Sequence, residues 1–258
     1  MTGLYIHIPF CASRCIYCGF YSTTLSRLKD EYVNSLILEL ETRRNEISEG
    51  ISTIYLGGGT PSLISISQIC SLFGHIKGIS SWEQDAEITM ECNPEDITEE
   101  FVKGLTYLPV NRISMGAQTF DDDRLRFLHR RHTSKQVHEA VDRLRSIGMD
   151  NISLDLMFGF PNESISQWSN DIQECLSLGV EHISAYSLMY EEGTPLYSML
   201  QEGKVAEITD EESLKMYDTL CDTLTAAGYE HYEISNFARP KFRSRHNSSY
   251  WTGKKYVG

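Results

Sequence analysis

Residues 5–21 read YIHIPFCASRCIYCGFY and place three cysteines, Cys11, Cys15 and Cys18, directly after a short apolar run. The run from Leu4 to Ile8 is rich in β-branched and aromatic residues, and Pro9 follows it, which predicts a β-strand that ends there. The C-x3-C-x2-C spacing lets three thiolates of one loop converge on one inorganic centre. This stretch therefore predicts a first strand that delivers a metal-binding loop.

Two metal chemistries fit three clustered cysteines. A structural zinc ion is closed by four ligands, and the remaining candidates for a fourth are His7 or a distant cysteine. An iron–sulfur cluster normally takes four cysteines, so three of them leave one iron open to a further ligand. We therefore expect a 4Fe-4S cluster on Cys11, Cys15 and Cys18, with a zinc-stabilised binding protein as the alternative.

Short β-rich runs alternate with amphipathic helical patterns along the rest of the chain. The expected strands cover residues 4–8, 53–56, 87–91, 112–115, 152–156, 182–187 and 231–234. Such alternation implies right-handed crossovers and a mainly parallel sheet. The sequence thus predicts an α/β fold, best described as an incomplete TIM-like (β/α)6 barrel over residues 1–236.

Two helices carry clear boundary signals. An apolar stripe from Val137 to Ile147 stops at Gly148, and Thr209 with Glu212 forms a capping box at the start of another helix. Beyond residue 236 the pattern fades into a basic stretch, residues 239–245. We expect residues 237–258 to begin a carboxy-terminal extension that is truncated here.

Composition limits the classes of function. The chain has 258 residues, 41% of them hydrophobic, and a formal net charge of -13, which disfavours a nucleic-acid partner because phosphate binding depends on clustered Lys and Arg. No segment approaches the run of about 18 apolar residues that spans a bilayer. Seven cysteines with three in one loop suit a reducing cytoplasm. The remaining four, expected as buried small hydrophobes, are Cys70, Cys92, Cys175 and Cys221.

Polar residues and glycines follow several expected strands. Gly58, Gly59 and Thr60 end the second strand, Glu91 ends the third, and Gln118 and Asp155 belong to the fourth and fifth. A glycine run lets backbone approach a small ligand, although a tight strand-to-helix turn explains it equally. Reactive groups of barrels lie where strands end and loops begin. The common position of these residues therefore predicts a binding site.

Five segments, YIHIPFCASRCIYCGFY, YLGGGTPSL, ITMECNPE, NRISMGAQTF and LDLMFGFP, resemble the radical SAM superfamily. The resemblance is to the group of oxygen-independent coproporphyrinogen III dehydrogenase, HemN, and covers nearly the whole chain. It implies a 4Fe-4S cluster and S-adenosyl-L-methionine (SAM) as cofactors. The residues that it assigns to the SAM site are Tyr5, Tyr17, Gly58, Gly59, Thr60, Glu91, Gln118, Arg130 and Asp155. His129 stands where relatives usually have a glycine before the arginine.

The resemblance also implies a mechanism. SAM would chelate the open iron through its amino and carboxylate groups, and an electron from the cluster would break the sulfonium bond to give a 5'-deoxyadenosyl radical. Glu91 and Asp155 would pair with ribose hydroxyls or the amino group, and Arg130 with the carboxylate.

Two features distinguish subgroups of this family. The dehydrogenases carry a further cysteine two residues after the third cluster ligand, where this chain has Phe20. Near the other end, residues 246–251 form the H-N-x-x-Y-W motif typical of the haem chaperone family HemW. The resemblance therefore implies a haem chaperone on a radical SAM scaffold, with an oxygen-independent coproporphyrinogen III dehydrogenase as the alternative.

His246 has two interpretations. It is suited to hold haem iron while the aromatic rings beside it cover the macrocycle, or it fixes a loop. The partners implied by the resemblance are SAM, haem as cargo, an electron donor for the cluster, and membrane haem proteins through transient contact.

Overall fold

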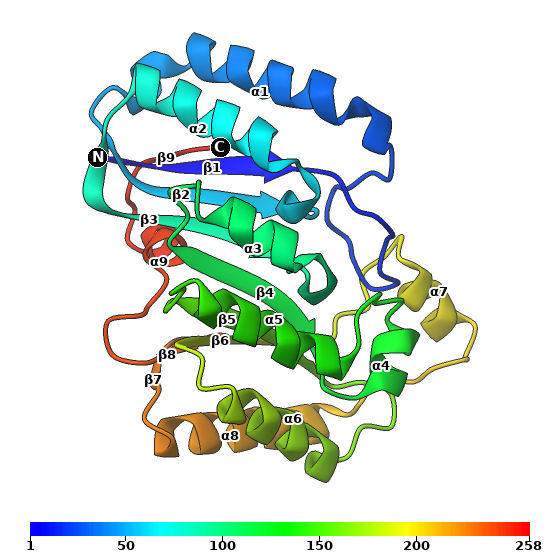
Figure 1. Ribbon diagram of the computed structural model, residues 1–258. Coiled ribbons are helices and arrows are strands. Elements are labelled where there is room, and N and C mark those ends of the chain that lie inside the picture. Colours follow the sequence, from blue (N-terminus) through cyan, green and yellow to red (C-terminus); the bar gives the residue numbers. More distant parts are fainter.

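The computed structural model describes residues 1–258 as an open, nine-stranded sheet with helices packed along it (Figure 1). The strands are β1 (Thr2–Ile8), β2 (Ile51–Gly58), β3 (Trp82–Cys92), β4 (Arg112–Gln118), β5 (Ile152–Phe158), β6 (His182–Ser187), β7 (Glu230–Glu233), β8 (Asn236–Ala238) and β9 (Tyr256–Val257). The helices are α1 (Lys29–Thr42), α2 (Ile66–Ile79), α3 (Glu99–Leu105), α4 (Asp122–Phe127), α5 (Ser134–Ser146), α6 (Ile165–Ser177), α7 (Pro195–Gln201), α8 (Asp210–Ala226) and α9 (Arg245–Trp251).

Strands β1 to β6 are neighbours in chain order and run parallel. Strand β9 joins β1 at one edge, and β8 and β7 join β6 in antiparallel orientation at the other. No pairing closes the two edges on each other. The predicted incomplete (β/α)6 barrel is therefore confirmed. Each predicted strand overlaps an observed strand.

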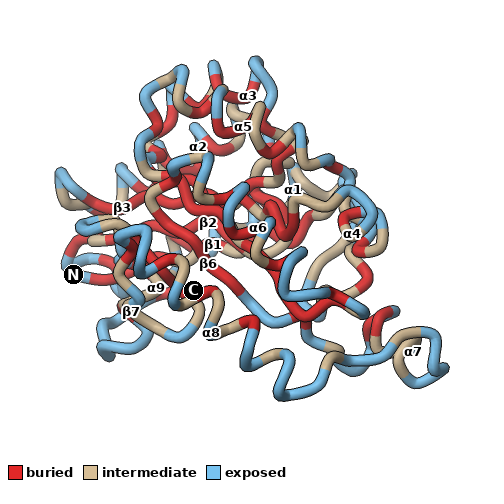
Figure 2. The backbone as a smooth tube through the Cα atoms, turned by 90° about the horizontal axis from the view of Figure 1, so that it is seen from below, coloured by how far each residue is buried: buried red, intermediate tan, exposed pale blue.

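The two faces of the sheet have opposite character because side chains alternate along a strand. Residues such as Ile54, Met90 and Leu154 face the helices in one continuous hydrophobic core. The other face carries buried polar side chains, among them Thr53, Glu87, Thr89, Arg112, Ser114, Ser153, His182 and Ser184. Buried residues concentrate along the strands, and exposed ones on the outer helices (Figure 2). The interior of the barrel is therefore polar, unlike the branched apolar filling of a closed TIM barrel.

The predicted helix boundaries also hold. Helix α5 buries its apolar stripe against the sheet, and Gly148, two residues beyond its end, has a φ of 81° that suits glycine. Helix α8 begins at the capping box in which the Thr209 hydroxyl accepts from the backbone N–H of Glu212. Of the four scattered cysteines, Cys92 and Cys175 are buried as expected. The expectation was wrong for Cys70, which is exposed on α2, and for Cys221, which is half-buried.

Residues 237–258 pack into the barrel. Strand β8 pairs with β6, and β9 pairs with β1. Between them the carboxylate of Glu87 on β3 accepts hydrogen bonds from the backbone N–H groups of Arg245 and His246 at the start of α9, at 2.8 and 2.9 Å. Acidic side chains stabilise a helix at this end. The domain boundary expected after residue 236 stays a prediction.

No helix combines the length and the apolar character that crossing a membrane requires.

A buried ion network fixes the loop that follows β5. The guanidinium of Arg124 on α4 pairs with Glu163 and lies 3.3 Å from the Asp171 carboxylate on α6. Glu163 accepts from the backbone N–H groups of Gly159 and Phe160 at 2.7 and 3.1 Å. The side chains of Glu163 and Asp171 are 0% and 3% exposed, so neither carboxylate has water to replace a lost cation.

We expect Arg124→Met to lower the free energy of unfolding by about 3 kcal/mol, because it leaves two buried carboxylates without their cation. Urea denaturation followed by circular dichroism measures the change. Arg126→Met is the matched control: its partner Asp123 is 87% exposed, so its loss should change stability by less than about 0.5 kcal/mol. Equal effects of the two substitutions would contradict the role of the network.

Candidate functional site

A cavity of about 430 Å³ lies inside the barrel and opens at the carboxyl ends of the strands. The loop of residues 9–28 and helices α4 and α7 gather at this end, whereas α9 lies at the other end of the strands (Figure 1). The sulfurs of the loop and the polar strand ends face one space, because all three loop cysteines line the cavity together with Glu91 and Asp155. The predicted clustering is therefore observed.

Hydrogen bonds connect the cysteine loop to the strand ends. The Thr60 hydroxyl donates to Cys11 Sγ at 3.7 Å, and Arg130 Nη1 donates to Cys15 Sγ at 3.7 Å. Asn93 bridges the two donors: its amide donates to Thr60 Oγ1 at 3.2 Å and its oxygen accepts from Arg130 Nη2 at 2.6 Å. The ends of β2 and β3 and the segment after α4 thus hold the loop in place.

The donor set suits a cluster better than a single ion. No three His, Cys, Asp or Glu side chains lie close enough together to hold one metal ion. The possible fourth zinc ligand, His7, does not line the cavity, and its ring nitrogens meet Tyr5 Oη at 3.1 Å and the Tyr21 carbonyl at 3.2 Å. A zinc ion needs four donors around one point, whereas the cysteines of a cluster are spread over several irons. Three thiols beside an open cavity match the second requirement.

Glu91 is held by two hydrogen bonds from β2. Its carboxylate accepts from Tyr55 Oη at 2.8 Å and from the backbone N–H of Gly58 at 2.9 Å. Burial raises the pKa of Glu91 to about 7, although both hydrogen bonds favour the charged form. The side chain is therefore a fixed acceptor whose charge changes near neutral pH.

Asp155 is the second buried carboxylate of the cavity. Burial raises its pKa to about 6, and hydrogen bonding from neighbouring serines opposes that shift. Ser114 Oγ on β4 donates to it at 3.4 Å. Glu91 and Asp155 thus project into the cavity from β3 and β5, with β4 between them.

Gln118 reaches the cavity through an irregularity in β4. Met115 pairs with Leu154 and Gln118 with Leu156, so β4 has one more residue than β5 over this interval. Gln118 has a φ of 67°, a left-handed conformation that is uncommon for glutamine. Bulges of this kind re-aim side chains next to functional sites.

The glycine run packs against β1 and also borders the cavity. A Cβ on Gly58 would lie 2.4 Å from the His7 ring, and a Cβ on Gly59 would lie 2.8 Å from the Phe10 carbonyl oxygen. Close packing of β1 and its loop against β2 therefore requires glycine at both positions. Both residues, with Thr60, also line the cavity.

Arg130 occupies the predicted position despite its unusual neighbour. Besides Cys15 and Asn93, its guanidinium donates to the carbonyl of Gly116 at 2.7 Å. The preceding residue, His129, has a φ of 59°, in the left-handed region that glycine adopts most easily. The backbone thus explains why glycine suits this position, and it tolerates histidine without displacing Arg130.

The two tyrosines assigned by resemblance differ in placement. Tyr17 lines the cavity between Cys15 and Cys18, and burial raises its pKa strongly. Tyr5 does not line the cavity. Its ring stacks on that of Tyr55, with the centroids 6.1 Å apart, and Tyr55 in turn is the residue that donates to Glu91. A direct SAM contact by Tyr5 stays a prediction.

His246 is 0% exposed and belongs to α9, the helix at the opposite end of the strands from the cysteine loop (Figure 1). Its Nδ1 meets Thr53 Oγ1 at 2.8 Å, and its Nε2 meets the Tyr250 hydroxyl at 2.9 Å. Burial lowers the pKa of His246 to about 4, and the Arg112 charge adds to that shift. Haem ligation by His246 stays a prediction, and the structure favours the loop-fixing interpretation because both ring nitrogens are engaged.

Several cavity residues were missed in the sequence. Tyr55 positions Glu91, Ser114 contacts Asp155, and Tyr186 at the end of β6 faces the same space. Alternation along the strands was the available signal, since Tyr55 shares a face with Thr53 and Gly57.

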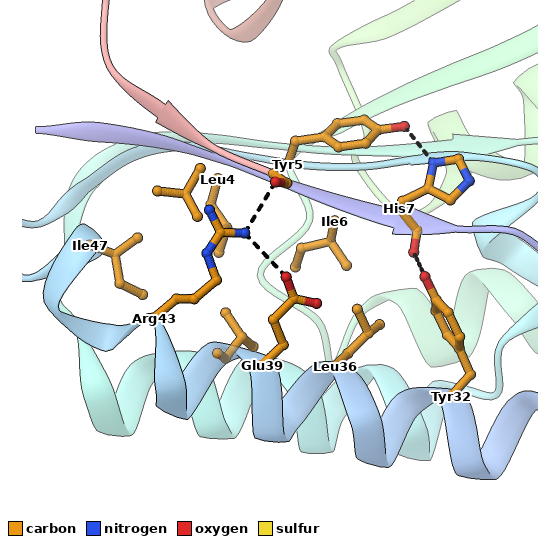
Figure 3. Close-up of a pocket in the computed structure, with 12 residues that line it drawn as sticks. Leu4, Tyr5, Ile6, His7, Tyr32, Leu36, Glu39, Arg43 and Ile47 are labelled. Carbon is orange, nitrogen blue, oxygen red and sulfur yellow. Dashed lines mark hydrogen bonds and ion pairs between the residues drawn. The ribbon is translucent and has the colours of Figure 1, made fainter. Parts of the chain in front are cut away.

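A second, smaller pocket of about 100 Å³ lies between β1 and α1 (Figure 3). Leu4, Ile6, Leu36 and Ile47 form its apolar wall. Arg43 reaches across it and donates to Glu39 and to the carbonyl of Gly258, each at 3.1 Å. Its lining contains no cysteine, so the metal-site residues belong to the larger cavity alone.

Comparison with known proteins agrees with this geometry. Residues 5–175 match the radical SAM superfamily. The chain is 40% identical to the heme chaperone HemW of Bacillus subtilis, covering 100% of this chain and 69% of that protein. For HemW of Lactococcus lactis the identity is 38%, over 100% of this chain and 67% of that protein. The chain thus spans about two thirds of the length of these relatives.

A more distant vertebrate relative and a solved structure extend the likeness. The mitochondrial radical S-adenosyl methionine domain-containing protein 1 of Danio rerio is 36% identical over 100% of this chain and 58% of its own length. The structure of HemN, coproporphyrinogen III oxidase from Escherichia coli, superposes with a TM-score of 0.84 at 24% identity, covering 98% of this chain and 58% of that one. The chain therefore belongs to the radical SAM superfamily and, within it, to the HemW family.

Proposed function

We propose that this chain is the radical SAM scaffold of a haem chaperone, which binds a 4Fe-4S cluster on Cys11, Cys15 and Cys18, SAM in the adjoining cavity, and haem as cargo for haem proteins. One observation carries the cofactor part: three thiols and two fixed carboxylates line a single cavity inside the barrel. The 40% identity to a heme chaperone supports the haem part.

The residues of the cavity have separate tasks in this proposal. Cys11, Cys15 and Cys18 would hold the cluster, which when bound would supply an electron and an open iron site for SAM. Thr60, Asn93 and Arg130 hold the cysteine loop at a fixed distance from β2 and β3. Burial raises the pKa of the Cys18 thiol, so iron binding there must displace a proton.

The strand-end residues would bind the ligand. Ionised Glu91 and Asp155 accept hydrogen bonds from hydroxyl or ammonium groups of SAM, and Arg130 offers its charge to the carboxylate. Gly58, Gly59 and Gln118 shape the wall, and Tyr17 covers the loop side. The barrel interior shields the reacting atoms from bulk water.

Oxygen-independent coproporphyrinogen III dehydrogenation is the alternative function. The likeness to HemN at 24% identity supports the fold and carries no substrate. Phe20 stands where the dehydrogenases carry a further cysteine. It lines the cavity and is 73% exposed. The absence of that cysteine favours the chaperone. We further propose a cytoplasmic location, an electron donor for the cluster, and transient contact with membrane haem proteins.

Removing one cluster ligand tests the metal site. After anaerobic reconstitution with iron and sulfide, Cys15→Ala should retain less than about a tenth of the wild-type cluster signal in the EPR spectrum of the reduced protein, because a cysteine ligand is lost. Cys70→Ala is the control, since Cys70 is an exposed cysteine on α2. Zinc without sulfide in the wild type would support the zinc-stabilised alternative instead.

SAM binding should depend on pH through Glu91. The carboxyl has a raised pKa of about 7, so it is ionised above that pH and becomes protonated as the pH falls through it. We expect SAM affinity, measured by isothermal titration calorimetry on the reconstituted protein, to fall about tenfold between pH 8 and pH 6. Glu91→Gln should bind weakly at both values. A wild-type affinity that is independent of pH would be inconsistent with ligation by Glu91.

Haem titration separates the two roles of His246. The intact wild-type protein should show a Soret band on haem binding. We expect His246→Ala to lower the free energy of unfolding by about 2 kcal/mol, through lost hydrogen bonds, and to keep the wild-type Soret position. A shifted or lost band in a folded variant would instead make His246 the ligand. No haem uptake by the wild type, with vinyl-bearing product formed from coproporphyrinogen III, would favour the dehydrogenase.

A further inference from the structure

Arg112, the first residue of β4, is a buried cation. Its side chain is 1% exposed, and neither Nε nor Nη1 has a hydrogen-bond partner. A guanidinium stays charged at every pH at which proteins fold. Such a group is costly to bury unless other charges compensate for the lost hydration. Its surroundings must therefore supply that compensation.

The strand register places Arg112 beneath the two carboxylates of the cavity. Arg112 pairs with Thr89, and two residues later Ser114 pairs with Glu91. Both β4 residues point into the barrel, because alternate residues share a face. Two residues of strand correspond to about 6.6 Å, which a long guanidinium side chain can span. Ser114 also contacts Asp155, so Glu91 and Asp155 lie over the same part of β4.

Few of the groups around Arg112 carry negative charge. The Arg112 charge acts on titratable side chains from several elements, among them Tyr55, Glu91, Asp155, His182, Tyr232 and His246, from β2, β3, β5, β6, β7 and α9. Burial raises the pKa values of the tyrosines and lowers those of the histidines, so all four are neutral.

Two other charges lie in the same interior. The carboxylate of Glu87 is engaged by the start of α9, and Arg130 acts on Asp155 from the cysteine side. Glu91 and Asp155 are the cavity-lining carboxylates on which the Arg112 charge acts. In the pKa values of both carboxyls, the Arg112 charge opposes the effect of burial.

We propose that Arg112 is a positioning residue of the cavity: its buried charge keeps Glu91 and Asp155 ionised, so that both can accept hydrogen bonds from SAM. This inference rests on the proposed SAM site. It gives a role in ligand binding to a residue that does not line the cavity and need not touch the ligand.

The direct test is the titration of Glu91 without ligand. In protein with isotope-labelled glutamate carboxyls, Glu91→Gln identifies the Glu91 resonance by NMR. Arg112→Met should move its midpoint upward by about one unit, whereas Arg112→Lys, which keeps the charge, should stay near the wild type. Arg143→Met removes a guanidinium from the outer helix α5 and should leave the midpoint unchanged. An unchanged midpoint in a folded Arg112→Met would overturn the inference.

SAM binding supplies the second readout. Because Arg112→Met raises the pH at which the carboxylates ionise, its affinity should be about tenfold below wild type at pH 7 and should approach wild type at pH 9. A purely structural role would lower affinity equally at both values and would contradict the inference. If the wild type bound no SAM at any pH while the Glu91 midpoint still shifted in Arg112→Met, the proposed SAM site would fail and the electrostatic role of Arg112 would stand.

Discussion

The parallel register of β1 to β6 is the constraint on which the site depends. Parallel neighbours bring their carboxyl ends to one rim, so residues from distant parts of the sequence meet there without any further arrangement. Glu91 and Asp155 are 64 residues apart in the sequence, yet they lie over the same stretch of β4. The same register places Arg112 one layer below them. A slip of one residue in β4 would turn both Arg112 and Ser114 toward the helices.

The inward face of the sheet carries charged and polar side chains, whereas the face that packs against the helices is hydrophobic. The core between sheet and helices provides most of the burial that holds the fold together. Because that core stabilises the fold, the inward face can carry carboxylates, histidines and a guanidinium. The hydrophobic core offsets the desolvation free energy that burying these groups costs. This division lets a small set of polar residues be arranged for binding without weakening the packing of the helices.

Much of the fold was predictable from the sequence, because hydrophobic periodicity and capping residues are local signals. The stripe before Gly148 and the Thr209–Glu212 capping box each located a helix end. The cysteine loop and the strand-end residues Glu91 and Asp155 were also found, since their position after apolar runs is visible in the sequence. Arg112 and Tyr55 were not found, because their importance depends on which strand lies beside which. The burial of His246 depends on a contact with Thr53, and the packing of residues 237–258 on strand pairs far apart in the chain.

The polar lining of the cavity affects how a cell would distinguish copies of the protein with bound cofactors from copies without them. A cavity of about 430 Å³ lined by thiols and carboxylates is large and polar enough to admit water when no ligand fills it. Ligands that bind the folded form and not the unfolded chain draw the equilibrium toward the folded state. Copies without ligands therefore open more often and spend more time accessible to proteases. Cofactor insertion would in this way act as a maturation checkpoint, with turnover removing chains that never acquired their cluster.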